Sequence, residues 1–137
     1  MQKLNLPEFD FRVEKEKIFC LIRKKWIVLT PEEWVRQHFI NLMVNHLGYP
    51  KGMIRLEQSL KYFKNAKRSD IVLLNPESGI FMIVECKATN IPIDQKVINQ
   101  VAQYNKILNG RYVVVSNGLK HFIWEGNVQL KAFPNYS

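Results

Sequence analysis

The sequence has few cysteines, no long hydrophobic run and no nucleotide-binding glycine loop, and each absence excludes a class of protein. Its 137 residues contain two cysteines, Cys20 and Cys86, which cannot build a disulfide framework and are not spaced as half of a zinc site. We therefore expect a reducing compartment, the cytoplasm. No apolar run approaches the ~18 residues of a membrane-spanning helix, and the first residues lack the hydrophobic stretch of a signal peptide. The P-loop pattern is also missing, which excludes a P-loop motor or kinase within these residues.

Acidic residues are scarce relative to basic ones. Lys and Arg total 20 against 12 Asp and Glu, which gives a formal charge of +8. This excess favours a polyanionic partner, nucleic acid first and an anionic membrane surface second. The hydrophobic content of 47% argues against disorder. The length suits a single domain over residues 1–137.

Two helices are expected. Thr30, Pro31 and Glu33 have the spacing of an N-cap, a first-turn proline and a capping box, and the helix that they begin should stop before Gly48. A second helix is predicted over residues 94–108, where an aspartate can cap its first turn and Asn-Gly follows its end.

Eight short segments have the composition or alternation of strands. They are residues 18–22, 26–29, 53–60, 70–74, 80–86, 111–116 and a terminal hairpin, 120–125 with 128–133. Two of them, 70–74 and 80–86, are almost continuously apolar, as in strands covered on both faces. The predicted fold class is α/β, with a central mixed sheet flanked by helices, a core over about residues 30–125 and extra N- and C-terminal strands.

Charged residues interrupt the two central apolar strands. Asp70 begins one strand, and Glu85-Cys86-Lys87 ends the next. Because strand side chains alternate, Glu85 and Lys87 share one face while Cys86 points to the other. A hairpin joining the strands would bring Asp70 beside Glu85, so that two carboxylates and an ammonium group converge at one end of the sheet.

This set of groups suits metal-dependent hydrolysis of a phosphodiester. Asp70 and Glu85 would bind Mg²⁺, or Mn²⁺, with the Cys86 carbonyl as an additional oxygen ligand. The ion would polarise the phosphoryl group and acidify a bound water. Lys87 would orient or deprotonate that water, or neutralise developing charge. The alternative interpretation is structural, since a charge at a strand end is usually a solvated tip and Ser-Asp before a strand is usually a turn.

Residues of both helices are candidates for the same site. Glu32 falls inside the inward apolar stripe of the first helix and would reach the metal, or else it only favours the helix dipole. Glu33 falls outside that stripe and is explained by the cap. Gln100 and Tyr104 are i,i+4 neighbours at the sheet-facing border of the second helix. They would hold a substrate phosphate or support Lys87, although amphipathic helices often carry such pairs without a function.

Basic residues gather in two places and favour contacts to a phosphate backbone, which give affinity without sequence choice. One cluster, with no acid among its members, leads directly to Asp70 and consists of Lys61, Lys64, Lys67 and Arg68. The other is Arg23-Lys24-Lys25. For each cluster the alternative is a solvated loop in a basic protein.

Six short segments, in order along the chain, carry a family resemblance. They are Thr30–Gln37 (TPEEWVRQ), Leu47–Pro50 (LGYP), Arg68–Val72 (RSDIV), Val84–Lys87 (VECK), Gln100–Tyr104 (QVAQY) and Ser116–Gly118 (SNG). Together they resemble the N-terminal domain of type I restriction enzyme R subunits (HsdR-like), within the PD-(D/E)xK nuclease superfamily. The resemblance implies a restriction-endonuclease-like core of order αβββαβ and Mg²⁺-dependent DNA cleavage.

The resemblance also assigns roles. Asp70 and Glu85 match the metal carboxylates, Lys87 matches the catalytic lysine, and the superfamily's helix glutamate would be Glu32 or Glu33. Gln100 and Tyr104 match the Q-x-x-x-Y motif. R subunits continue into an ATP motor, so a protein partner that supplies targeting or motor function is implied, besides DNA.

Three functions therefore remain to be compared. The first is a Mg²⁺-dependent DNA endonuclease. The second is a non-catalytic nucleic-acid-binding or accessory protein that keeps the nuclease fold. The third is a protein-interaction role in which the terminal hairpin is an assembly edge.

Overall fold

The computed structural model describes residues 2–56 and 71–137. Over these residues the fold is mixed α/β, with two α-helices and two sheets. The first half comprises β1 (Val13–Glu14), β2 (Lys17–Phe19), β3 (Trp26–Val28), α1 (Pro31–Asn41), a π-helical turn η1 (Leu42–His46), a 3₁₀ turn η2 (Lys51–Met53) and β4 (Ile54–Leu56). The second half comprises β5 (Ile71–Leu74), β6 (Ile80–Cys86), α2 (Gln95–Leu108), β7 (Tyr112–Ser116), β8 (His121–Glu125) and β9 (Val128–Leu130).

The larger sheet has the strand order β4-β5-β6-β7-β8-β9. Its neighbours pair antiparallel except β6 and β7, which are parallel and are joined by α2. A parallel pair needs such a crossover because a tight turn reverses the chain direction and would make the next strand antiparallel. Over the described residues from 31 to 116, the elements follow the predicted order of helix, three strands, helix and strand.

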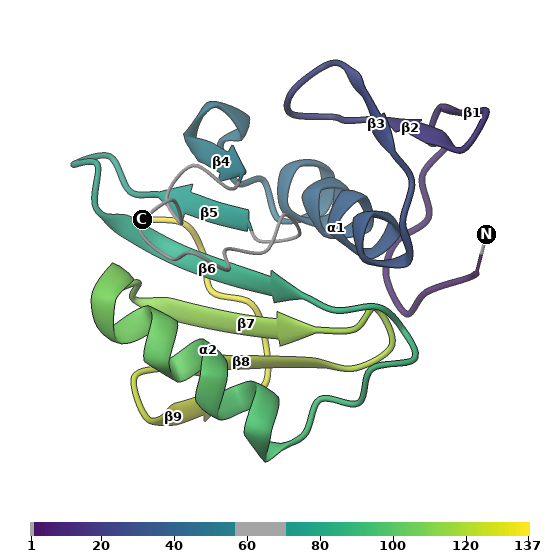
Figure 1. The fold of residues 1–137 in the computed structure, drawn as a ribbon. Coiled ribbons are helices and arrows are strands. Elements are labelled where there is room, and N and C mark those ends of the chain that lie inside the picture. The colour runs from purple at the N-terminus through teal and green to yellow at the C-terminus, as the bar shows by residue number, and fades with distance from the viewer. Residues whose placement is uncertain (1, 57–70) are drawn as a thin grey trace.

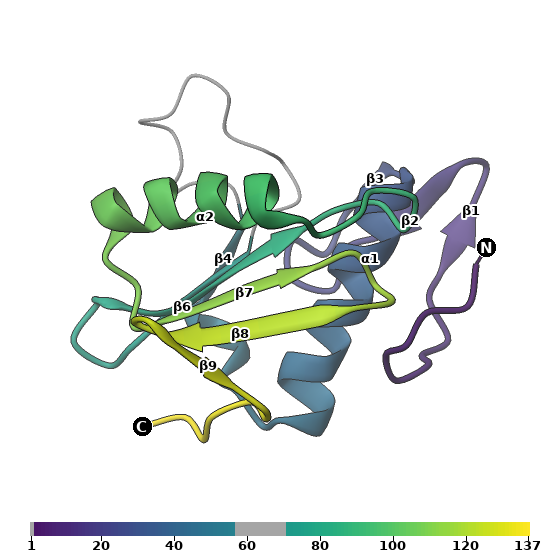
Figure 2. The ribbon, with the colours of Figure 1, turned by 90° about the horizontal axis from the view of Figure 1, so that it is seen from below.

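The two helices cover opposite faces of this sheet (Figure 2). On one face, Val35 and Phe39 of α1 pack with Met82 and Val84 in the main core. On the other face, Val101 of α2 belongs to a smaller cluster with strand residues that include Val72, Ile83 and Val115. Burial on both faces explains why β5 and β6 are almost continuously apolar.

A register shift in β6 sets which side chains reach which face. Leu73 pairs with Met82 but Leu74 pairs with Ile80, so Phe81 is the extra residue of a bulge. Beyond the bulge the alternation is regular. Val84 and Cys86 lie in the α1-side core, whereas Ile83 lies in the α2-side cluster. Glu85, two residues after Ile83, therefore belongs to the α2 side of the sheet.

Local capping explains where the helices begin and end. The Thr30 hydroxyl accepts a hydrogen bond from the Glu33 amide (3.0 Å), and the Asp94 carboxylate accepts one from the Val97 amide (3.0 Å). Asn109 ends α2 in the left-handed region, at φ 55°. These caps confirm the predicted starts of both helices and the predicted end of α2. The first helix ends as an α-helix at Asn41 and continues as the π-helical turn η1 to His46 before Gly48.

The observed strands differ from the predicted ones in the first sheet and in the terminal hairpin. The strand predicted over 18–22 corresponds to β2, which ends at Phe19, before the turn over residues 20–25. The two-residue strand β1 was not predicted, because Val-Glu has no readable period. It pairs with β2 in a separate sheet, β1-β2-β3, beside α1 (Figure 1). The predicted strand over 53–60 is described only to Leu56. Both strands of the terminal hairpin are present but shorter than predicted.

Among the described residues, no helix is both long and apolar enough to cross a lipid bilayer.

Candidate active site

The Glu85 and Lys87 side chains form a buried ion pair at the end of β6. Cys86 is paired with Ser116 of β7, and the Lys87 amide donates to the Ser116 carbonyl at 2.8 Å, so the chain stays extended through Lys87. The Lys87 Nζ lies 3.0 Å from Glu85 Oε1, with side chains only 9% and 3% exposed. The predicted shared face is confirmed. Each charge offsets much of the other's cost of leaving water.

Glu85 lies beside a small crevice whose walls are mostly apolar. Glu85 and Tyr104 line this crevice between β5, β6 and α2, together with Ile71, Val72, Ile83, Val84, Val101 and Leu108. Walls of this kind lower the local dielectric constant and strengthen charge interactions within the crevice. Gln100 is exposed on α2, and it is not among the described residues that line this crevice. The structure thus brings Tyr104, but not Gln100, toward Glu85.

Cys86 lies on the opposite face from Glu85. Its thiol is fully buried, and burial, reinforced by the negative charge of Glu85, raises its pKa well above the usual range. The thiol therefore stays protonated and is a poor metal ligand. The predicted ligand was the Cys86 carbonyl oxygen, and that role stays a prediction.

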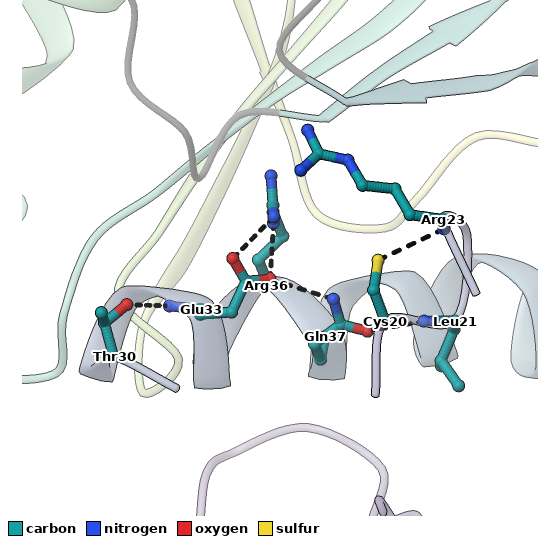
Figure 3. A network of polar contacts seen from close by, with 7 residues as sticks. All are labelled: Cys20, Leu21, Arg23, Thr30, Glu33, Arg36 and Gln37. Carbon is teal, nitrogen blue, oxygen red and sulfur yellow. Dashed lines mark hydrogen bonds and ion pairs between the residues drawn. The ribbon is translucent and has the colours of Figure 1, made fainter. Parts of the chain in front are cut away.

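The first turns of α1 hold a second buried charge cluster, shown in Figure 3. Arg36 donates from Nε to Glu33 Oε2 at 2.7 Å and from Nη2 to Glu33 Oε1 at 2.6 Å. Gln37 Nε2 donates to Glu33 Oε2 at 2.9 Å. Glu33 is 7% and Arg36 1% exposed. The Glu33 carboxylate thus serves α1 itself and does not reach back to close the capping box.

The orientation predicted for the two helix acids is wrong. Glu32 is exposed, and Glu33 is the buried acid. The helical wheel failed because α1 is covered on more than one side: almost every residue from Glu33 to Met43 is buried. Arg36 was not singled out from the sequence. Its position three residues after Glu33 was the available signal, since i,i+3 charges are neighbours on a helix.

Several predicted site residues lie outside the described part of the chain. They are Asp70 and the basic residues Lys61, Lys64, Lys67 and Arg68. What the structure does show is that β5 pairs antiparallel with β6, beginning at Ile71 opposite Val84. Within residues 2–56 and 71–137, no group of three or more His, Cys, Asp or Glu is arranged to hold a metal ion.

Comparison with known families identifies the matching region. A family model described as the type I restriction enzyme R protein N terminus matches residues 31–136. The chain belongs to this family. A search of curated proteins and a search of solved structures each returned no match. The matched residues of this R-protein N-terminal domain include the Glu85–Lys87 pair and the Glu33 cluster, whereas β1, β2 and β3 precede them.

In this family member, the Ser-Asn-Gly segment at the end of β7 is bonded to the loop that follows the Glu85–Lys87 pair. Asn117 Oδ1 accepts from the amides of Leu119 and Lys120 at 3.0 and 2.9 Å. Asn117 Nδ2 donates to the Ile91 carbonyl at 2.9 Å. This bond ties the turn between β7 and β8 to the loop that follows Lys87, which limits how far the end of β6 can move.

Proposed function

We propose that the protein is a Mg²⁺-dependent DNA endonuclease of the restriction-modification class, built on a restriction-endonuclease-like core. The observation that carries the proposal is the Glu85–Lys87 pair, buried on one face at the end of a central strand, in a chain of the R-protein N-terminal family. The observed order of helices and strands supports the proposed core. The charge of +8 supports a polyanionic substrate.

The donor set fits a hard divalent cation in part. Glu85 supplies one carboxylate, and Asp70, which directly precedes β5 in the sequence, would supply the second. The Cys86 carbonyl would be a third oxygen ligand. When bound, Mg²⁺ would polarise the scissile phosphate and acidify a coordinated water.

Lys87 has a role that follows from its position. Its ammonium group lies 3.0 Å from Glu85 Oε1. A metal ion bound to the Glu85 carboxylate would weaken the attraction between that carboxylate and Lys87. Lys87 would then turn toward the substrate, where it would stabilise a phosphate oxygen or orient the attacking water. Tyr104 lines the same crevice as Glu85 and would hold a substrate phosphate or support Lys87.

The test is cleavage of supercoiled plasmid and of single-stranded DNA with Mg²⁺, Mn²⁺ or EDTA. We expect metal-dependent cutting that falls by roughly 10²–10⁴-fold in Lys87→Ala and Glu85→Gln, the range for loss of a catalytic acid–base or charge-stabilising group. Lys106→Ala, an exposed lysine on α2, is the matched control and should cut at the wild-type rate. Cutting that persists in Lys87→Ala would remove Lys87 from the mechanism.

A second candidate function is a non-catalytic nucleic-acid-binding or accessory module. It is favoured by the close pairing of the Glu85 carboxylate with the Lys87 ammonium group, in which each charge offsets the other. This function predicts salt-sensitive DNA binding with no metal-dependent cutting by the wild-type protein. Under either function we propose DNA and a subunit with targeting or motor activity as partners, and membership of the R-protein N-terminal family supports this proposal.

A further inference from the structure

Residues 2–30 lie before the family match but are built into the domain. Ile18 and Cys20 are fully buried, and Cys20 belongs to the main core. The Trp34 indole donates to the Gln2 carbonyl at 2.7 Å, and the Asn5 amide donates to the Gly118 carbonyl at 2.8 Å. This N-terminal segment is therefore fixed against both α1 and the end of the large sheet.

Several hydrogen bonds constrain the turn over residues 20–25, between β2 and β3. The Cys20 amide donates to the Lys25 carbonyl, and the Lys24 amide donates to the Cys20 carbonyl, both at 2.9 Å. The Arg23 amide donates to the Cys20 Sγ at 3.4 Å. Lys24 adopts a left-handed conformation, at φ 54°. The backbone of the turn is thus held in one shape.

A side chain of α1 anchors this turn. Gln37 Oε1 accepts from the Leu21 amide at 3.1 Å, while Gln37 Nε2 donates to Glu33. Gln37 is fully buried. One amide side chain therefore connects the Glu33–Arg36 pair to the turn. In Figure 3, the Arg23 side chain extends over α1 toward the guanidinium group of Arg36.

The anchored turn is strongly basic. It carries Arg23, Lys24 and Lys25 in succession, and no acidic residue occurs from Lys17 to Pro31. Lys24 and Lys25 are exposed. A rigid backbone that presents adjacent cations loses little conformational entropy when it meets a row of anions, and DNA phosphates form such a row.

We propose that the turn over residues 20–25 binds the phosphate backbone of duplex DNA, and that Gln37 is the positioning residue that fixes it. The proposal rests on the proposed function, because DNA is its substrate, and adds a contact outside the family match. Backbone contacts of this kind position a duplex without reading its bases. The turn therefore supplies affinity and orientation, while the end of β6 supplies the chemistry.

The first test measures binding of a labelled oligonucleotide duplex by fluorescence anisotropy, in EDTA so that no metal-dependent cleavage occurs. Lys24→Asn/Lys25→Gln removes two charges, and asparagine tolerates the left-handed conformation of position 24. The matched control, Lys96→Gln/Lys106→Gln, removes two exposed charges from α2. We expect the slope of log K against log salt to fall in magnitude by about 2 in the turn variant, because each phosphate contact contributes roughly 0.9. An unchanged slope, or an equal change in the control, would overturn the proposal.

The second test removes the anchor and leaves the charges. Gln37→Leu should accelerate hydrogen exchange at the Leu21 amide and weaken duplex binding several-fold, with the salt slope retained because the cations remain. Wild-type affinity in Gln37→Leu, with fast exchange at Leu21, would show that the anchor does not position the turn. Stronger binding of the wild-type protein to phosphatidylserine vesicles than to DNA would overturn the choice of partner.

Cleavage at low salt, over DNA concentrations up to saturation, separates this inference from the proposed function. The control variant Lys96→Gln/Lys106→Gln should then cut at the wild-type rate, the deficit of the turn variant should shrink as the DNA concentration rises, and Lys87→Ala should stay roughly 10²–10⁴-fold slow at every DNA concentration. If the turn variant binds normally and Lys87→Ala is inactive, the inference fails and the proposed function stands. If the turn variant loses binding and the wild-type protein never cuts, the inference stands and the proposed function fails.

Discussion

Replacing Arg36 with methionine should destabilise the protein more than most core substitutions. Methionine has a similar length and good helix propensity, so the main change is the loss of the guanidinium group. Glu33 would lose the two charge-assisted bonds from Arg36, at 2.7 and 2.6 Å, and would keep the bond from Gln37. A buried carboxylate would be left without its counter-charge.

The size of the effect follows from the burial of the pair. Arg36 is 1% exposed, so water cannot replace it without opening the core. Breaking a buried pair by removing one partner costs about 3–5 kcal/mol. For a domain of this length, each kcal/mol lowers the melting temperature by roughly 3–4 °C. Arg36→Met should therefore melt about 10–20 °C below the wild-type protein.

The double variant Glu33→Gln/Arg36→Met is the control, since it removes both charges and keeps the side-chain volumes similar. Its stability should return to within about 1 kcal/mol of wild type, because a neutral pair carries no desolvation cost of charge. Urea unfolding followed by circular dichroism gives the free energy of unfolding of the wild-type protein, of each single variant and of the double variant, which completes the double-mutant cycle. A loss below about 1 kcal/mol in Arg36→Met, or no recovery in the double variant, would refute the reasoning.

Three further predictions concern stability. Gly118 has φ 86°, and an added Cβ would lie 3.0 Å from side-chain atoms of Leu4 and Val35, so Gly118→Ala should cost about 1–3 kcal/mol in urea unfolding; a neutral result would contradict the close approach. Burial raises the pKa of Tyr49 from 10.0 to about 12, so the folded state holds this proton more tightly, and stability should fall as pH rises from about 10 to 12, less so in Tyr49→Phe. Burial lowers the pKa of His121, so the unfolded state binds this proton more readily and stability should fall as the pH decreases below about 6.5. In thermal melts at acid pH, His121→Gln should lose less stability than the wild-type protein, and parallel pH profiles of the two proteins would contradict this prediction.

The sequence predicted best where one local rule acted alone. Strand β6 was predicted with its observed limits, Ile80–Cys86, because its apolar run begins after Gly79 and ends in Glu85-Cys86. The limits of α2 followed from an aspartate cap and from Asn109. The shared face of Glu85 and Lys87 required only the two-residue period of a strand.

Prediction failed where packing on several sides decided the outcome. The wheel assigned Glu32 to the interior, but α1 contacts both the large sheet and the N-terminal segment, so the buried surface is not one stripe. Glu33 can be buried because Arg36 and Gln37 donate hydrogen bonds to its carboxylate. No single-sequence pattern contains the Gln37–Leu21 bond, because it joins residues that only the tertiary fold brings together.

The two cysteines of the chain are both fully buried, and the Cys86 thiol is held in its protonated form. The folded protein should therefore be nearly silent to maleimides and other thiol reagents. In a Lys24→Cys variant, the exposed new thiol would be labelled much faster than the two buried cysteines. A fluorophore or spin label at this position would report the distance between the basic turn and a labelled DNA duplex. Because the native thiols react only when the core opens, their slow labelling rate would measure the rate of core opening.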